Sequence, residues 1–85
     1  MPSRPTQSTL AELSVGRSAV VASIDDQLTG VQRLMALGLV EGCTVTLVRR
    51  ALGGDPLEIS IRDAAMSVRK AEARHIRVNT SSTNS

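Results

Sequence analysis

The chain has 85 residues, of which 41% are hydrophobic and none is aromatic. This length fits one small domain, whose core must be aliphatic, with about 1.5–3 kcal/mol from each fully buried large side chain. A single cysteine, Cys43, excludes an intramolecular disulfide. The N-terminus has no apolar signal region, and no apolar run reaches the roughly 18 residues of a membrane span. These features predict a cytoplasmic protein without direct membrane insertion.

The charge balance is mild, with ten basic residues against eight acidic ones and a net charge of +2. The basic residues are scattered along the chain. Single-strand nucleic-acid binders usually stack bases on aromatic side chains, and this chain has none. Composition therefore argues against nucleic-acid binding, although the charge alone leaves it open.

Little regular structure is predicted for the first residues of the chain. Residues 1–9 contain two prolines and several hydroxyl residues, which is typical of a flexible leader. Leu10 and Leu13 are spaced so that both can dock on the core. The uncharged, β-branched run 18–24 predicts a strand that is buried on both faces or covered on its outer face.

A two-turn helix is predicted after this strand. Thr29 and Gln32 match a capping box, with the hydroxyl at the N-cap. Helical spacing puts four residues on one face: Val31, Leu34, Met35 and Gly38. Gly38 can take the left-handed conformation that ends a helix, so that Leu39 folds back onto the helix. Arg33 points away from the apolar face, and packing does not account for it.

The rest of the chain is predicted to form short strands with turns between them. Strands are predicted at 44–50, at 57–62, around Met66 and Val68, and around Ile76 and Val78, with a helical turn at 70–74. About five short strands, one helix and one helical turn favour a mainly β, small closed or half-open barrel. The domain is expected to span residues 10–78, followed by a disordered polar tail at 79–85.

The main loop, residues 51–56, contains two glycines and a proline, which oppose regular structure. Leu52 in this loop is either tucked inward or offered to a partner, and both alternatives stay open. The glycines could cradle a phosphate, but the helix start and lysine of a phosphate-binding loop are missing.

No catalytic or metal-binding arrangement is predicted. The single histidine, His75, is expected at the surface, and Cys43 is expected to be a small, semi-buried residue. A metal site needs several converging ligands, and nucleophilic catalysis needs a matched base. We therefore expect a non-enzymatic protein without a cofactor or metal site.

The chain from Leu10 to Val78 resembles the FeoA family of bacterial ferrous iron uptake. The resemblance rests on four segments in this order: Leu10-x-x-Leu13-x-x-Gly16, Arg33-Leu34-x-x-Leu37-Gly38-Leu39-x-x-Gly42, Gly54-Asp55-Pro56 and Val68-Arg69-Lys70-x-Glu72-Ala73. The chain departs from the family pattern at Glu41, where proline is usual, and at 51–53, where one glycine is added. These departures affect the rigidity of the turns.

The resemblance implies an SH3-like barrel that supports FeoB, a membrane ferrous iron permease with a cytosolic GTP-binding domain. Its implied role is regulatory contact with that cytosolic part. The candidate partner-binding residues lie on the helix, its exit and the loop: Arg33, Met35, Leu39, Leu52 and Asp55. A divalent-metal sensor and a small nucleic-acid-binding barrel are the alternatives, and self-association remains open.

Overall fold

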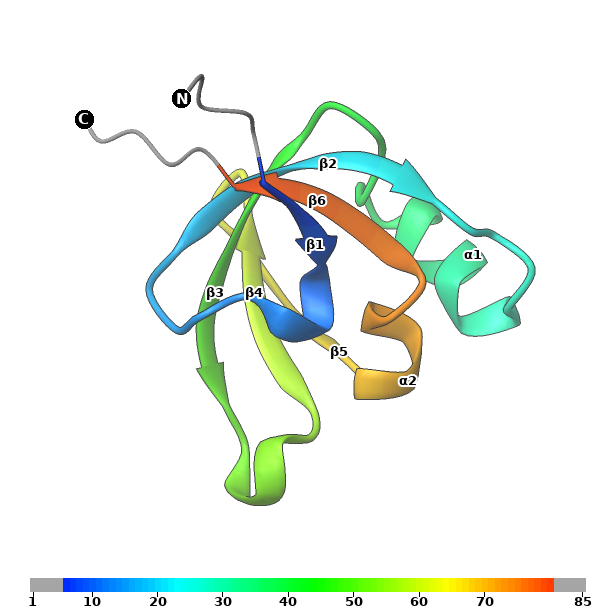
Figure 1. Ribbon diagram of the computed structural model, residues 1–85. Helices are drawn as coiled ribbons and strands as arrows, with labels where there is room; N and C mark the ends of the chain where they lie inside the picture. Colours follow the sequence, from blue (N-terminus) through cyan, green and yellow to red (C-terminus); the bar gives the residue numbers. More distant parts are fainter. Residues whose placement is uncertain (1–5, 81–85) are drawn as a thin grey trace.

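Six antiparallel strands form one sheet that curls around the core (Figure 1). The computed structural model describes residues 6–80, and the sheet order is β1-β6-β2-β3-β4-β5. The strands are β1 (Thr6–Thr9), β2 (Ser18–Ile24), β3 (Thr44–Arg50), β4 (Leu57–Ile61), β5 (Ala64–Val68) and β6 (Ile76–Thr80). The helices are α1 (Thr29–Ala36) and α2 (Lys70–Ala73), with 3-10 turns η1 (Leu10–Glu12) and η2 (Leu52–Gly54). The predicted mainly β fold, with one two-turn helix and a helical turn before the last strand, is confirmed.

The structure adds a sixth strand to the predicted five. β1 lies where we expected a flexible leader, and it pairs with β6 from Thr6↔Thr80 to Thr9↔Arg77. Asn79 and Thr80, expected in the polar tail, belong to β6. The strand has no apolar residue to create an alternating pattern, so only the backbone pairing reveals it. The rest of the expected leader and tail, residues 1–5 and 81–85, lies outside the described residues.

The core is built from alternating positions of the strands. In β4, Leu57, Ile59 and Ile61 are buried, as the predicted alternation requires. In β2, Ala19 and Val21 are buried but Val20 between them is exposed, so the predicted burial of both faces is wrong there. The first half of β2 therefore has a solvated outer face, which is common in antiparallel sheets.

The start of α1 differs from the prediction. Leu28 occupies the N-cap position, and no side-chain hydrogen bond caps the helix. The predicted capping box is therefore wrong: Thr29 already lies inside the helix, and Gln32 Nε2 donates instead to the carbonyl of Asp26 at 2.9 Å. The preceding loop, rather than a hydroxyl, anchors the first turn.

The end of α1 agrees with the prediction. Gly38 has φ +119°, a conformation that costs glycine little. The amide of Gly38 donates to the carbonyl of Met35 at 3.1 Å, and that of Leu39 to the carbonyl of Leu34 at 3.0 Å. This pair of bonds is the Schellman motif. It turns Leu39 back into the core, where Leu34 and Leu39 are both fully or nearly fully buried.

Arg50 holds the N-terminal segment against β3. Its Nη2 donates to the carbonyls of Ala11 at 2.8 Å and Leu13 at 2.7 Å in a part-buried position. We expect Arg50→Ala to lower the free energy of unfolding by about 1–3 kcal/mol, because two acceptors lose a charged donor. Denaturant unfolding checks this. Arg49→Ala is the matched control, since Arg49 makes only an exposed ion pair with Glu58. An equal loss in both variants would contradict the anchoring role.

Candidate functional site

An apolar hollow lies beside the exit of α1. It has a volume of about 370 Å³ and is lined by residues from the exit of α1, the start of β3 and the β4–β5 turn: Leu37, Val40, Cys43, Ile61, Arg62 and Ala64. Leu37 is 59% exposed and Val40 is 45% exposed. The Schellman turn buries Leu39 but leaves its neighbours Leu37 and Val40 at the rim. We call this surface the apolar hollow.

Two predicted contact residues belong to α1 near the hollow. Arg33 is exposed, and within residues 6–80 its side chain makes no hydrogen bond or ion pair. Met35 is half-buried. Arg33 can therefore offer an uncommitted guanidinium to a carboxylate, and Met35 can offer a flexible apolar contact. Their assignment to a partner surface stays a prediction.

The prediction that Leu39 belongs to the partner-binding surface is not compatible with its burial. Leu39 is 0% exposed and belongs to the main core cluster. A partner that docks on the folded domain cannot touch a side chain with no accessible area. The residues that sequence reasoning missed are Leu37 and Val40. The signal was present in the apolar run Leu37-Gly38-Leu39-Val40, because a helix exit can turn only part of such a run inward.

The structure excludes the inward alternative for Leu52 in the loop between β3 and β4, because its side chain is 100% exposed. Its contact with a partner stays a prediction. The loop makes a tight turn at Leu52–Gly54, in which Gly53 has a non-helical φ of +83°, so the glycines oppose regular structure as predicted. Leu52 is thus offered to solvent at the tip of the hairpin rather than tucked inward.

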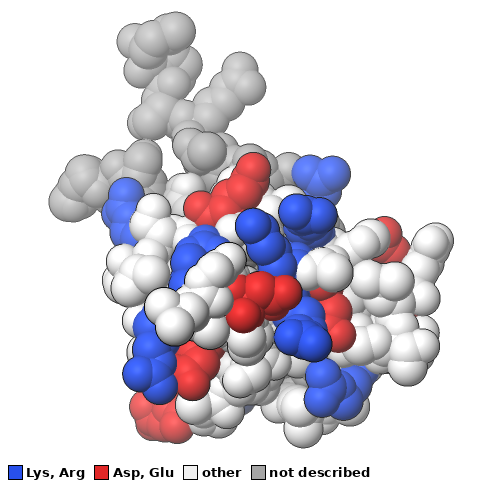
Figure 2. Space-filling model, turned by 90° about the horizontal axis from the view of Figure 1, so that it is seen from below, with Lys and Arg blue, Asp and Glu red and all other residues white. Residues whose placement is uncertain are grey.

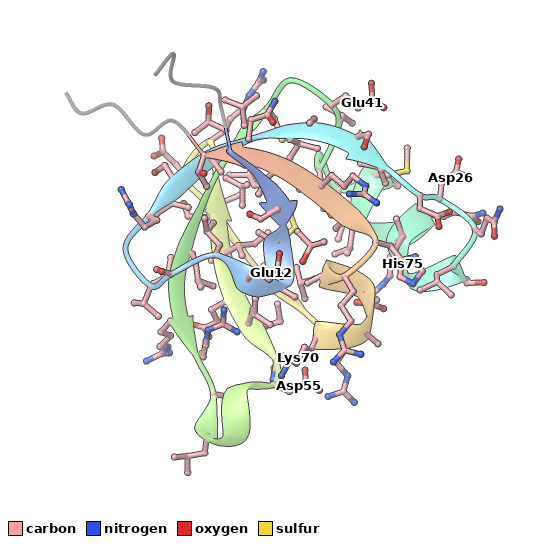
Figure 3. The ribbon with its side chains drawn as sticks, viewed as in Figure 1. Glu12, Asp26, Glu41, Asp55, Lys70 and His75 are labelled. Atoms are coloured by element: carbon pink, nitrogen blue, oxygen red, sulfur yellow. The ribbon has the colours of Figure 1, made fainter. Side chains whose placement is uncertain are left out.

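Asp55 has a structural partner. Its Oδ1 accepts a hydrogen bond from the backbone amide of Lys70 at 2.9 Å, and the two residues lie together in Figure 3. Lys70 is the first residue of α2, so the carboxylate satisfies one of the amides that a helix start leaves free. This bond links the β3–β4 loop to α2 and accounts for Asp55 without a partner protein.

The predicted contact residues do not form one patch. α1 and the apolar hollow's helical rim lie at one side of the molecule, whereas the loop that carries Leu52 projects from the bottom of the β3–β4 hairpin (Figure 1). One compact epitope cannot cover both. The structure therefore separates two candidate surfaces, a hollow beside the exit of α1 and a loop that exposes Leu52 fully.

Asp25 and His75 connect the end of β2 to the start of β6. His75 Nδ1 lies 3.1 Å from Asp25 Oδ2, and the amide of Asp25 donates to the carbonyl of His75 at 2.9 Å. His75 is therefore more than the plain surface residue that we predicted. The hydrogen bond from His75, together with one from the amide of Gln27, lowers the pKa of Asp25 below its ordinary value of 3.8.

This pKa shift predicts a small pH dependence of stability. A lowered folded-state pKa stabilises the fold above pH 3.8, and the gain is lost as the pH falls through the folded-state value. The melting temperatures of wild type and Asp25→Asn should therefore converge as the pH is lowered past 3.8. In a His75→Gln background the difference should already be smaller at neutral pH. A constant difference across the whole range would contradict this account.

Metal-ligand geometry is not present in the part of the chain that the structure describes, because no three His, Cys, Asp or Glu side chains cluster there. Cys43 is buried and is one of the residues that line the apolar hollow, close to the semi-buried position that was predicted. No helix within residues 6–80 is long and apolar enough to cross a membrane.

The surface charge is mixed. Figure 2 shows the face seen from below, where Lys and Arg alternate with Asp and Glu. Exposed ion pairs such as Arg49–Glu58 contribute to this pattern, with a distance of 2.7 Å between Nε and Oε1. A nucleic-acid interface requires a continuous basic patch. This face offers none.

Comparison with known proteins identifies the family. The family model described as the FeoA domain matches residues 8–80. Among curated proteins, the chain is 33% identical over 75 residues to the Fe(2+) transport protein A/Fe(2+) transporter FeoB fusion protein of Porphyromonas gingivalis. That match covers 88% of this chain but only 9% of the fusion protein.

Two solved structures are similar over most of their length. The solution structure of FeoA from Chlorobium tepidum shares 34% identity, with a TM-score of 0.81 over 91% of this chain and 73% of that one. FeoA of Stenotrophomonas maltophilia, described as an SH3-domain protein complexed with zinc, shares 35% identity, with a TM-score of 0.73 over 82% and 87% of the two chains. The predicted SH3-like fold and the absence of enzymatic activity are confirmed by this family assignment, and we conclude that the chain belongs to the FeoA family.

Proposed function

We propose that this protein is a cytoplasmic accessory subunit of ferrous iron uptake that acts by contact with the cytosolic GTP-binding part of an FeoB-type permease. The observation that carries this proposal is the fusion protein of Porphyromonas gingivalis, in which a similar FeoA domain and an FeoB transporter share one chain. Covalent fusion keeps two domains at a high effective concentration, which benefits domains that act together.

The surface of the domain supports a role in protein contact. The apolar hollow exposes Leu37 and Val40, and Arg33, whose guanidinium is uncommitted, lies one helical turn before Leu37. Arginine is enriched among the residues that dominate binding energy, and the buried centre of an interface is more apolar than its rim. We therefore assign the permease contact to the apolar hollow and the adjoining face of α1, with Leu52 as a separate, peripheral contact.

The direct test is a binding measurement between this chain and a purified cytosolic fragment of FeoB. Calorimetry or biolayer interferometry should give saturable binding, with and without guanine nucleotide in parallel samples. A difference in affinity between the samples with and without guanine nucleotide would show that the contact depends on the nucleotide state of the GTP-binding domain. No binding in either state would remove the main support of the proposal.

Arg33→Ala tests the polar part of the proposed contact. Because the Arg33 side chain has no partner among the described residues, the melting temperature should stay within about 2 °C of wild type. Binding to the FeoB fragment should weaken about fivefold or more, as expected for the loss of an interfacial arginine. Arg17→Ala, an exposed arginine in the turn before β2, is the matched control. Lost stability without lost binding would instead mark Arg33 as structural.

Divalent-metal binding is the second candidate, since the Stenotrophomonas maltophilia relative is described as complexed with zinc. Calorimetry with Fe(II), Mn(II) and Zn(II) under reducing conditions tests it. We expect no micromolar binding to the monomer, because no three ligand side chains cluster within residues 6–80. Micromolar binding at one site per chain would favour the metal-sensing function.

A further inference from the structure

The β5 edge of the sheet is open. Within residues 6–80, β5 pairs with β4 alone, so its other side is a free edge in this part of the chain. The strand reads Ala64-Ala65-Met66-Ser67-Val68, without a charge or proline. Exposed edge strands are usually protected from pairing by charged residues, prolines or bulges. β5 has none of these within its five residues.

The register identifies the backbone groups on this free edge. The β4–β5 turn consists of Arg62 and Asp63, which both have positive φ, as in a two-residue type I′ hairpin. The pair next to such a turn, Ile61↔Ala64, exchanges both backbone hydrogen bonds, and bonded and non-bonded pairs then alternate. Ala65 and Ser67 are therefore in non-bonded pairs. Their amides and carbonyls point away from β4, and both residues are exposed.

The free edge is complementary to itself. If two copies of β5 run antiparallel with Met66 opposite Met66, Ala65 of each copy faces Ser67 of the other. Ala65 and Ser67 are the two residues whose backbone groups point outward, so this register allows four hydrogen bonds. Asp63 then lies beside Arg69 of the second copy, and the twofold axis repeats this pair. The extended pairing ends at Ala64 and Val68, because Arg62 and Asp63 form the turn and α2 begins at Lys70. Asp63 and Arg69 are the residues next to its two ends.

We propose that this protein forms a twofold dimer in which β5 pairs with β5 of a second copy, extending the sheet across the interface. The half-buried Met66 side chains meet at the axis, and thioethers adapt well to such contacts. A twofold interface closes on itself, so association stops at the dimer. A five-residue strand is a small interface, and we expect a dimer that dissociates in the micromolar range. The argument for this dimer does not rest on the proposed contact with the permease, although Ala64 belongs both to β5 and to the lining of the apolar hollow.

Analytical ultracentrifugation of the whole chain across the micromolar range tests the dimer. Wild type should shift reversibly from monomer to dimer as the concentration rises. Arg69→Glu places a carboxylate beside Asp63 and should weaken the dimer about tenfold or more, because like charges then face each other twice. The double variant Asp63→Lys/Arg69→Glu reverses both signs and should restore most of the affinity. Arg17→Glu makes the same charge change in the turn before β2, outside the β5 edge, and should leave the dimer affinity unchanged.

Ala65→Pro provides a second test that does not depend on charge. Its amide points outward, so proline at this edge position removes no bond to β4 but blocks pairing with another strand. The variant should stay monomeric at all concentrations with the wild-type sheet content by circular dichroism. If Ala65→Pro does not fold, the Arg69→Glu variant and the double variant Asp63→Lys/Arg69→Glu decide whether the dimer forms through β5. A wild type that is monomeric throughout, or a dimer that survives either Arg69→Glu or Ala65→Pro, overturns the proposal.

Hydrogen exchange distinguishes this dimer from one formed elsewhere. The amides of Ala65 and Ser67 should become protected as the concentration is raised, whereas they should exchange at the same rate at all concentrations in Arg69→Glu. Protection that appears only when another protein is added would show that β5 accepts a strand from that protein instead of a second copy, and would overturn the self-pairing.

Discussion

Leu37→Glu is expected to weaken binding to the cytosolic fragment of FeoB by about 10–100-fold, while the melting temperature changes little. Leu37 is 59% exposed at the rim of the apolar hollow, so the fold does not depend on its burial. A leucine buried on binding contributes about 1.5–3 kcal/mol, and 1.4 kcal/mol corresponds to tenfold in affinity. A carboxylate at this position also loses solvation in an apolar contact. Calorimetric titration of the variant against the FeoB fragment measures the effect.

Val15→Glu is the matched control for Leu37→Glu. Val15 is 56% exposed, almost the same fraction as Leu37. It belongs to the segment between η1 and β2, which lies away from α1 in Figure 1. If binding depends on general surface apolarity, both variants should lose affinity equally. If it depends on the apolar hollow, only Leu37→Glu should. Full binding by Leu37→Glu would exclude the hollow and leave the Leu52 loop as the remaining candidate surface.

Leu39→Ala should have the largest effect on stability among the candidate contact residues. Leu39 is 0% exposed in the core cluster, and replacing such a leucine by alanine costs about 2–5 kcal/mol. In a domain of this size each kcal/mol lowers the melting temperature by about 4–8 °C. A decrease of about 10 °C or more is therefore expected, or loss of folding if the total stability is small. Thermal and denaturant unfolding measure it.

Leu52→Ala is the contrasting variant, since Leu52 is 100% exposed. Its melting temperature should equal that of wild type, because no buried area is lost. For Leu39→Ala, binding to the FeoB fragment should be retained per folded molecule at a temperature well below unfolding. A stable Leu39→Ala variant with lost binding would contradict the assignment of Leu39 to the core.

Local sequence was sufficient to predict much of the fold. The alternation in β4 identified its buried face, and Gly38 identified the end of α1. Both features depend on neighbouring residues and on the geometry of a single strand or turn. The failures were at positions where a distant segment supplies the partner. β1 requires β6, and Gln32 finds the carbonyl of Asp26 instead of taking part in a capping box.

The candidate site shows the same division between local and distant information. The sequence by itself determined the family, the turn glycine at Gly38 and the presence of an apolar run at the helix exit. Only the tertiary structure decided that Leu39 packs inward while Leu37 and Val40 border a hollow. It also assigned Asp55 to the start of α2. The physical reason is that side-chain exposure depends on which surfaces the fold brings together, and residues far apart in the chain provide those surfaces.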